Sequence, residues 1–159
     1  MSKLCFKEVN EENFDTVIGL TDTLDEVQKQ CVAPNVYSIA EATLYPDNVY
    51  YRAIYYDNKP VGFFMVFIPD EKSKAKGDKD FFLWRLMLVK TYQHKGLGKK
   101  AMDKIVALAK TKGYRKVLLS CDPIEGGPLP FYAAYGFYKN GKMYGDEIGM
   151  TYRISDENE

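Results

Sequence analysis

The sequence is poor in the residues that carry most metal and disulfide chemistry. It has three cysteines and a single histidine, His94. Cys5, Cys31 and Cys121 are odd in number, scattered and without CxxC spacing, so we expect free thiols in a reducing cytoplasm. A lone histidine disfavours both a multi-histidine metal site and a histidine-based catalytic triad, and we expect no metal.

Long apolar runs are also lacking. The longest, Val61–Ile68, is far below the roughly 20 residues that span a bilayer. The N-terminus, MSKLCFKEV, has no apolar segment of the kind found in signal peptides. We therefore expect a cytoplasmic chain without membrane contact. Its 159 residues suit one domain, 1–159, in which residues 155–159 form a frayed tail.

The chain has no net charge, but its charges are segregated. Between Glu8 and Asp47 there are nine acids and one base, whereas Lys90 to Lys116 holds nine bases and one acid. Two regions of opposite sign suggest two ligands of opposite charge; the alternative is that both are solvated helix faces. Nucleic-acid binding has little support, because the chain is not basic overall.

The most informative stretch runs from Phe81 to Gly113. The apolar run Phe81–Val89 predicts a strand, and a polar turn leads from it into Gly96-Leu97-Gly98. A helix then follows, with an apolar stripe at helical spacing made of Leu97, Ala101, Ile105, Leu108 and Ala109. A strand, a glycine loop and a helix N-terminus together form an anion site, because the first helical amides lack internal partners.

The remaining elements are predicted from periodicity and turn residues. Proline and asparagine signals place a short helix between Pro34 and Pro46, with Val36, Ile39, Ala40 and Leu44 as its apolar stripe. Residues 70–80 contain almost no apolar side chain and are predicted to be a solvated loop. The other predictions are strands at 4–6, 49–56, 61–68, 117–121, 137–138 and 147–154, and helices at 13–20, 21–33 and 129–135. The 117–121 strand is expected to run parallel to Phe81–Val89.

Two motifs carry a resemblance to a known family. Residues 93–98, QHKGLG, match a Q/R-x-x-G-x-G/A signature, and residues 131–137, FYAAYGF, match a later F-Y-x-x-x-G-F hallmark. Both lie in the right order and between the right elements, so the chain resembles the Gcn5-related N-acetyltransferase (GNAT) superfamily. The resemblance implies a single α/β (α+β) domain. Its sheet would be mixed and mostly antiparallel, with six to seven strands, a splayed parallel central pair and flanking helices.

The resemblance also implies a binding site for acetyl-CoA as cosubstrate. Backbone groups of Leu86, Met87 and Leu88 would pair with the thioester and the pantetheine arm. Amides of the loop would hold the pyrophosphate, with charge added by lysines; these residues are Gln93, His94, Lys95, Gly96, Leu97, Gly98, Lys99 and Lys100. The alternative for the glycines is a simple tight turn. His94 fits a phosphate-contacting or exposed role better than a catalytic one.

Tyr132 matches the family position whose phenol protonates the departing CoA sulfur, although a tyrosine there can equally be a core aromatic. The base is not identified by the resemblance. Some members carry a glutamate eleven residues before the signature glutamine, where this chain has Phe82. Proton removal is left to Glu41 through water, to another acid, or to backbone carbonyls. Glu125 replaces a pantetheine-contacting asparagine, and that contact is not transferred.

For the acceptor, residues 32–42 (VAPNVYSIAEA) and 83–87 (LWRLM) are similar to bacterial spermine/spermidine (diamine) N-acetyltransferases. This implies a small cationic polyamine as partner, with Glu41 as the acceptor-site carboxylate; a solvated helix carboxylate is the alternative. Other acceptors are an amino acid, an aminoglycoside or a protein N-terminus, and a non-catalytic acyl-CoA-binding regulatory module is a different class. Members of the family commonly form homodimers, and nothing in this sequence decides that point.

Overall fold

The computed structural model describes residues 3–156, so the last part of the predicted frayed tail, residues 157–159, lies outside the described residues. The strands are β1 Leu4–Lys7, β2 Val49–Tyr56, β3 Lys59–Phe67, β4 Phe81–Leu88, β5 Lys116–Cys121, β6 Tyr138–Tyr144 and β7 Glu147–Arg153. The α-helices are α1 Phe14–Gly19, α2 Glu26–Cys31, α3 Asn35–Ala42, α4 Glu71–Ala75, α5 Leu97–Thr111 and α6 Leu129–Tyr135. Two short 3-10 helices complete the set, η1 Leu20–Thr23 and η2 Lys90–Tyr92.

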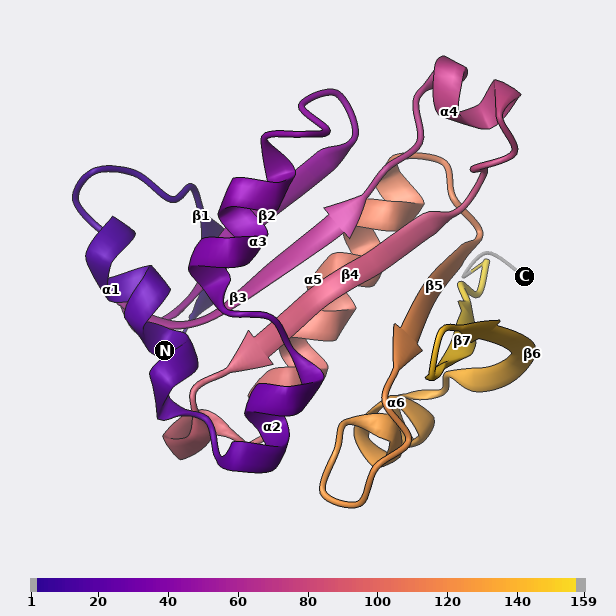
Figure 1. Cartoon of the computed structure of the whole chain (residues 1–159). Coiled ribbons are helices and arrows are strands. Elements are labelled where there is room, and N and C mark those ends of the chain that lie inside the picture. The colour runs from indigo at the N-terminus through magenta and orange to yellow at the C-terminus, as the bar shows by residue number, and fades with distance from the viewer. Residues whose placement is uncertain (1–2, 157–159) are drawn as a thin grey trace.

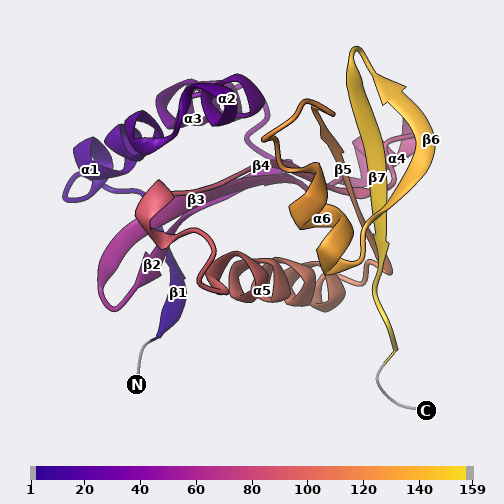
Figure 2. The same cartoon turned by 90° about the horizontal axis from the view of Figure 1, so that it is seen from below.

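All seven strands form one sheet in the order β1-β2-β3-β4-β5-β7-β6 (Figure 1). Every neighbouring pair is antiparallel except β4 and β5, which are parallel and joined through α5. Helices α1, α2 and α3 cover one face of the sheet, and α5 covers the other, with α6 beside it (Figure 2). The predicted fold class, a mixed and mostly antiparallel sheet with a parallel central pair, is confirmed.

The parallel pair is short. Only Phe81, Phe82 and Leu83 of β4 pair with β5, opposite Val117, Leu118 and Leu119. Beyond these pairs the two strands diverge, as Figure 1 shows. We call this region the splay; it comprises residues 84–88 of β4 and residues 120–121 of β5. Because β5 continues to pair with β7 and β4 with β3, the sheet opens here without either strand losing its outer partner.

The core lies on both faces of the sheet, under α5 on one side and under α1–α3 on the other. β3 is central and buried on both faces, with Phe63 and Phe64 fully shielded from solvent. On α5 the predicted stripe is buried except for the half-buried Leu108, and Met102 joins it at 0% exposure. Among residues 3–156, none of the helices combines the length and the apolar character that crossing a bilayer would require.

The predicted apolar stripe of α3 is wrong. Val36 and Leu44 are 47% and 71% exposed, whereas Asn35 and Ser38 are fully buried. The buried side is polar because Asn35 has partners there: its Nδ2 donates to the Val17 carbonyl at 2.8 Å, and its backbone N–H donates to Thr21 Oγ1 at 3.0 Å. Specific hydrogen bonds to the neighbouring helices thus decide which face of α3 is buried.

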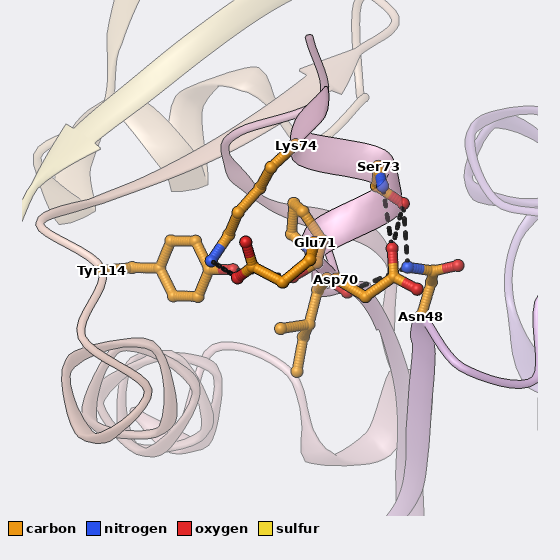
Figure 3. Close-up of polar contacts among 8 residues, drawn as sticks. Asn48, Asp70, Glu71, Ser73, Lys74 and Tyr114 are labelled. Atoms are coloured by element: carbon orange, nitrogen blue, oxygen red, sulfur yellow. Dashed lines mark hydrogen bonds and ion pairs between the residues drawn. The ribbon is translucent and has the colours of Figure 1, made fainter. Parts of the chain in front are cut away.

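The prediction of a loop throughout residues 70–80 is also wrong, since α4 lies within it. Asp70 is its N-cap: one carboxylate oxygen accepts bonds from the backbone N–H and from the hydroxyl of Ser73, each at 2.8 Å (Figure 3). Asn48 Nδ2 donates to the Ser73 hydroxyl at 3.1 Å. Two hydrogen bonds from Ser73 lower the pKa of Asp70; the bond from the backbone N–H has the larger effect and the bond from the hydroxyl the smaller one. A good cap can hold a single helical turn that has no apolar face.

Candidate active site

The loop between β4 and α5 is shaped for an anion. His94 and Gly96 have positive φ values of 59° and 81°, which turns the chain sharply before the helix. The first intrahelical bond runs from the Lys100 N–H to the Gly96 carbonyl, and no side chain caps the helix among the described residues. The N–H groups of residues 97–99 are therefore available to a ligand at the positive end of the helix dipole.

The side chains of this loop divide into two groups. Gln93 is engaged by protein: its Nε2 donates to the Leu88 carbonyl at 2.8 Å, and its Oε1 accepts from Gln28 Nε2 at 2.8 Å. His94 and Lys95 are exposed, and Lys99 forms a surface pair with Asp103 at 3.2 Å. The amide of Gln93 fixes the shape of the loop, and the cationic side chains remain at its surface. The loop residues predicted to bind CoA thus lie together.

The strand residues predicted to bind CoA lie at the splay. Leu86, Met87 and Leu88 pair with β3 on one side of β4 and have passed the last β5 partner on the other. Apart from the Leu88 carbonyl, which accepts from Gln93 Nε2, the backbone N–H and C=O groups on that second edge need partners, and a ligand lying along β4 can supply them. Met87 is buried, and its sulfur accepts a bond from Asn35 Nδ2 at 3.8 Å.

Tyr132 projects from α6 into an aromatic cluster. Its ring centroid lies 5.4 Å from that of Phe131 and 5.6 Å from that of Phe137, and only 8% of the residue is exposed. Within residues 3–156 its hydroxyl forms no hydrogen bond, yet the oxygen is not among the fully buried unpaired atoms. Burial raises the pKa of Tyr132 strongly. The phenol therefore keeps its proton at physiological pH and can donate it.

The two sequence motifs meet at Gly98. A Cβ built on this glycine would lie 3.0 Å from a ring carbon of Phe131, which is tighter than ordinary packing allows. The missing side chain lets the start of α5 approach α6 closely. Glycine at this position therefore places the anion loop and the Tyr132 helix side by side.

Glu41, the predicted acceptor carboxylate, lies on α3 opposite β4. Its Oε1 accepts from the Arg85 guanidinium at 2.9 Å, with 21% of the Glu41 side chain and 15% of the Arg85 side chain exposed. Burial lowers the pKa of Arg85, while the charge of Glu41 acts in the opposite direction. Glu41 is thus close to the splay, but it is held in an ion pair and its charge is balanced.

Comparison with known proteins decides the family. Residues 14–137 match the model of the acetyltransferase (GNAT) family. The chain belongs to the acetyltransferase (GNAT) family. This family consists of acetyltransferases.

Individual relatives of this GNAT domain are distant in sequence. N-acetyltransferase 8F1 of Rattus norvegicus is 26% identical over 83 residues, which cover 52% of this chain and 36% of that protein. The PaiA N-acetyltransferase of Thermoplasma acidophilum, solved with coenzyme A, is 17% identical with a TM-score of 0.69, over 96% of this chain and 99% of that one. A GNAT acetyltransferase of Elizabethkingia anophelis, solved with acetyl-CoA, is 14% identical with a TM-score of 0.65, over 96% and 98%.

Aromatic side chains surround the α1–α3 side of β4 in the GNAT domain. The ring of Tyr45, just after α3, lies 6.0 Å from that of Trp84, and the ring of Tyr144, at the end of β6, lies 5.6 Å from that of Phe82. Tyr45 and Tyr144 are 42% and 38% exposed. Two distant segments thus place accessible aromatic faces over one strand. No local pattern in the sequence predicts this convergence, because it depends on the loop after α3 and on the β6–β7 hairpin.

Helix α2 touches both loops that follow the diverging strands. On the β4 side, Gln28 donates to Gln93 at 2.8 Å, and Asp25 pairs with Lys90 at 3.6 Å. On the β5 side, the sulfur of Cys31 lies 3.4 Å from the Cβ position of Gly127. Helix α2 therefore bridges the end of the splay and connects the loop after β5 to the anion loop.

Glu147, the first residue of β7, was not found by sequence reasoning. Its Oε2 accepts from the Ser120 hydroxyl at 3.3 Å, and the residue is half-buried. Burial, followed by the charge of Glu147, raises the pKa of Cys121 to about 11. No local pattern in the sequence marks Glu147, because its place depends on how β7 registers against β5.

Two surface hollows lie away from the splay. One, of about 250 Å³, is lined by residues of β2 and the end of β1. The other, of about 360 Å³, is lined mainly by lysine and arginine near the C-terminal end of α5. That end of a helix is its negative pole, where cations are favoured for the stability of the helix itself. Neither hollow includes a residue predicted for the site.

Proposed function

We propose that this GNAT domain transfers acetyl from acetyl-CoA to a primary amine of a small polyamine of the spermidine or spermine type. The transfer is direct: the neutral amine attacks the thioester carbonyl, and the CoA thiolate leaves and is protonated. The observation that carries the acceptor proposal is the acidic, aromatic surface on the α1–α3 side of the sheet. A cytoplasmic place of action fits the three free thiols.

The acidic half of this surface has unbalanced charge. Of the nine acids between Glu8 and Asp47, four form ion pairs: Glu8, Asp25, Glu26 and Glu41. The other five are exposed and form no ion pair within residues 3–156: Glu11, Glu12, Asp15, Asp22 and Asp47. A negative field of this kind raises the local concentration of a polycation. The basic anion loop leads to α5, on the opposite side of the sheet (Figure 2).

The aromatic part supports binding of ammonium groups. Tyr45 and Trp84, together with Phe82 and Tyr144, present ring faces and edges beside β4. An ammonium over an aromatic face is stabilised by roughly 0.5–2 kcal/mol, depending on how far it is desolvated. A flexible chain with several ammonium groups can use such rings without a fixed set of carboxylates. This supports a polyamine more than an amino acid, whose carboxylate would be repelled by the acidic surface.

The test is a substrate panel. The purified protein is incubated with acetyl-CoA and one amine at a time, and released CoA is measured with a thiol reagent. The panel contains spermidine, spermine, free amino acids, an aminoglycoside and a peptide with a free N-terminus. We expect CoA release with the polyamines to exceed that with the other amines by at least about tenfold, as a difference of 1.4 kcal/mol in transition-state binding would give.

Two outcomes contradict the proposal. Release of CoA with another amine but not with spermidine would reject the polyamine and keep the acetyltransferase. No release with any amine, combined with binding of acetyl-CoA by calorimetry, would favour a non-catalytic acyl-CoA-binding module. Mass spectrometry of the product identifies the acetylated nitrogen in the successful case.

A further inference from the structure

Acetyl transfer to an amine needs a group that takes a proton from the acceptor, because only the neutral amine attacks a thioester. On the α1–α3 side, β4 contributes Phe82, Trp84 and Arg85, none of which accepts a proton at neutral pH. Glu41 faces them, but the Arg85 guanidinium pairs with its Oε1 at 2.9 Å and balances its charge. An ion-paired carboxylate is a weak proton acceptor, so a carboxylate on another element is the better candidate.

Glu147 has the position that this role requires. In the β5–β7 ladder, Ser120 pairs with Gly149 and Cys121 with Ile148, so Glu147 lies just beyond the last residue of β5. The Ser120 hydroxyl donates to Oε2 at 3.3 Å. Within residues 3–156, the other oxygen, Oε1, accepts no hydrogen bond. One oxygen is thus anchored at the splay and the other is available.

The register also fixes the side from which Glu147 approaches. Tyr144 is its partner in the β6–β7 ladder, so the two side chains share a face of the sheet. The Tyr144 ring meets that of Phe82 at 5.6 Å, so this is the face of β4 that α1–α3 cover. Tyr132 comes from α6, which lies on the α5 side (Figure 2). Glu147 and Tyr132 therefore reach the splay from opposite sides.

The electrostatics agree with this placement. Burial is the largest cause of the pKa shifts of Tyr132 and Arg85. Among the smaller causes, the charge of Glu147 raises the pKa of Tyr132 and also acts to raise the pKa of Arg85. Asp122, which directly follows β5, is the rival carboxylate. Its charge raises the pKa of Cys31 and of Cys121, but it is not a cause of the pKa shift of Tyr132 or of Arg85. The groups whose pKa the charge of Glu147 affects are Cys31 of α2, Arg85 of β4, Cys121 of β5 and Tyr132 of α6, and Tyr144 of β6 is its ladder partner.

We infer that Glu147 is the catalytic base that takes the proton of the acceptor ammonium. The proton moves to the Glu147 carboxylate, and the nitrogen lone pair then attacks the thioester carbon. When the C–S bond breaks, the sulfur takes the phenol proton of Tyr132, and Tyr132 regains a proton from the attacking nitrogen as the amide forms. Glu147 releases its proton to solvent, so the products are the amide, CoA and one proton.

This inference rests on acetyl transfer to an amine and not on the acceptor being a polyamine. The acceptor in the test is whichever amine of the panel the wild type acetylates fastest, so rejection of spermidine leaves the test intact. If the wild type acetylates no amine of the panel, the rate of the slow hydrolysis of acetyl-CoA is measured instead of the rate of amine acetylation. Water is then the acceptor, and Glu147 takes its proton.

The decisive variant is Glu147→Gln, which keeps the shape and the Ser120 contact but cannot accept a proton. We expect kcat to fall by about 100-fold or more at pH 7. The dissociation constant for CoA, measured by calorimetry, should stay within about twofold, because the anion loop is untouched. The rate of the variant should rise about tenfold per pH unit with the fraction of free amine, whereas the wild type is flatter. A purely structural role of Glu147 would not produce that pH profile.

Two variants serve as controls. Asp146→Asn removes the same charge from the exposed neighbouring turn residue and should leave the rate unchanged. Asp122→Asn tests the rival carboxylate and should cost far less than Glu147→Gln. Glu147→Asp restores a carboxylate one methylene shorter and should recover part of the rate. If Glu147→Gln fails to bind CoA, the rate of Glu147→Asp is the test instead.

The inference is overturned if Glu147→Gln keeps kcat within about twofold of the wild type at pH 7. It is equally overturned if Asp122→Asn causes the larger loss. A Glu147→Gln rate that is low but parallel to the wild type at every pH would assign Glu147 a positioning role instead of a proton-accepting one.

Discussion

Tyr132 differs from phenylalanine by one hydroxyl, and that hydroxyl makes no hydrogen bond to the described protein. Tyr132→Phe should therefore keep the aromatic packing with Phe131 and Phe137 and remove only the proton donor. We expect kcat for the best amine to fall by about 10- to 100-fold, with the KM for acetyl-CoA changed by less than about threefold. Steady-state kinetics by thiol release measure both. Because burial raises the pKa of Tyr132, the wild type should show no alkaline loss of rate due to its ionisation below pH 9.

An unchanged rate in Tyr132→Phe would return Tyr132 to the role of a core aromatic. Phe131→Leu is the matched control, since it alters the same cluster without touching a hydroxyl. A loss of kcat in both variants would mean that the packing of the aromatic cluster matters, whereas a loss of kcat in Tyr132→Phe alone would mean that the phenol proton of Tyr132 matters.

At this scale, the sequence predicts residues whose chemistry follows from their neighbours in the chain. Gly96 and Gly98 could be predicted because a glycine loop before a helix has one strong physical use. Tyr132 was indicated by its motif. Glu147 could not be found, because its role depends on a strand register between segments that are far apart in the sequence. Likewise, the pairing of Glu41 with Arg85 joins two elements whose contact is tertiary.

Helix α2 connects the α1–α3 side of the sheet to the anion loop, through the hydrogen bond from Gln28 to Gln93. Gln28→Leu removes that bond, and also the bond that Gln28 Oε1 accepts from the Asp25 N–H at the N-cap of α2, and leaves the Gln93 amide held only by the Leu88 carbonyl. A neutral hydrogen bond contributes about 0.5–1.5 kcal/mol, so we expect the KM for acetyl-CoA to rise by about two- to tenfold. The rate at saturating acetyl-CoA should change less, because no reacting group is removed.

Gln30→Leu is the control on the same helix, since Gln30 is exposed and its side chain makes no hydrogen bond among residues 3–156. Equal effects of the two variants would mean that any change to α2 matters, and not the link to Gln93. No effect of Gln28→Leu would mean that the loop holds its shape without α2.

The elements that the sequence predicted well are those with strong periodicity or unambiguous breaks, such as α5 and the β2–β3 hairpin. Helix α3 shows where such reasoning fails. Its apolar residues suggested a buried stripe, yet the partners of Asn35 lie inside the protein, and Val36 faces solvent. At α4 the prediction fails in the opposite sense: a loop is predicted, but the N-cap Asp70 stabilises a helix that has no apolar face. Both errors arise because the apolar periodicity of a sequence carries no information about polar contacts.

On the scale of the whole molecule, charge is divided between the two faces of the sheet. The α1–α3 side carries acids that form no ion pair within residues 3–156, and α5 carries bases, although the chain has no net charge. If the acceptor is a polycation, kcat/KM for spermine should fall several-fold when salt is raised from about 0.01 M to 0.15 M, as the screening length shortens from about 30 Å to about 8 Å. The fall should be smaller for an amine with one positive charge.

The matched variant is the triple change Glu11→Gln, Glu12→Gln and Asp15→Asn, at exposed positions away from the splay. It should reduce the salt dependence for spermine and leave kcat within about twofold. A salt dependence that is the same for both amines, or unaffected by the triple change, would contradict steering by the acidic face.

The short pairing of β4 with β5 has a consequence for how the chain folds. Strands β2, β3 and β4 follow one another both in sequence and in the sheet, so they can pair with small loop-closure costs, whereas β1 pairs with β2 across α1–α3. Strand β5 reaches β4 only after α5 has formed the crossover, and it pairs at just three positions. The splay therefore separates two parts of the sheet, β1–β4 and β5–β7, and each part has its own strand pairings without the other.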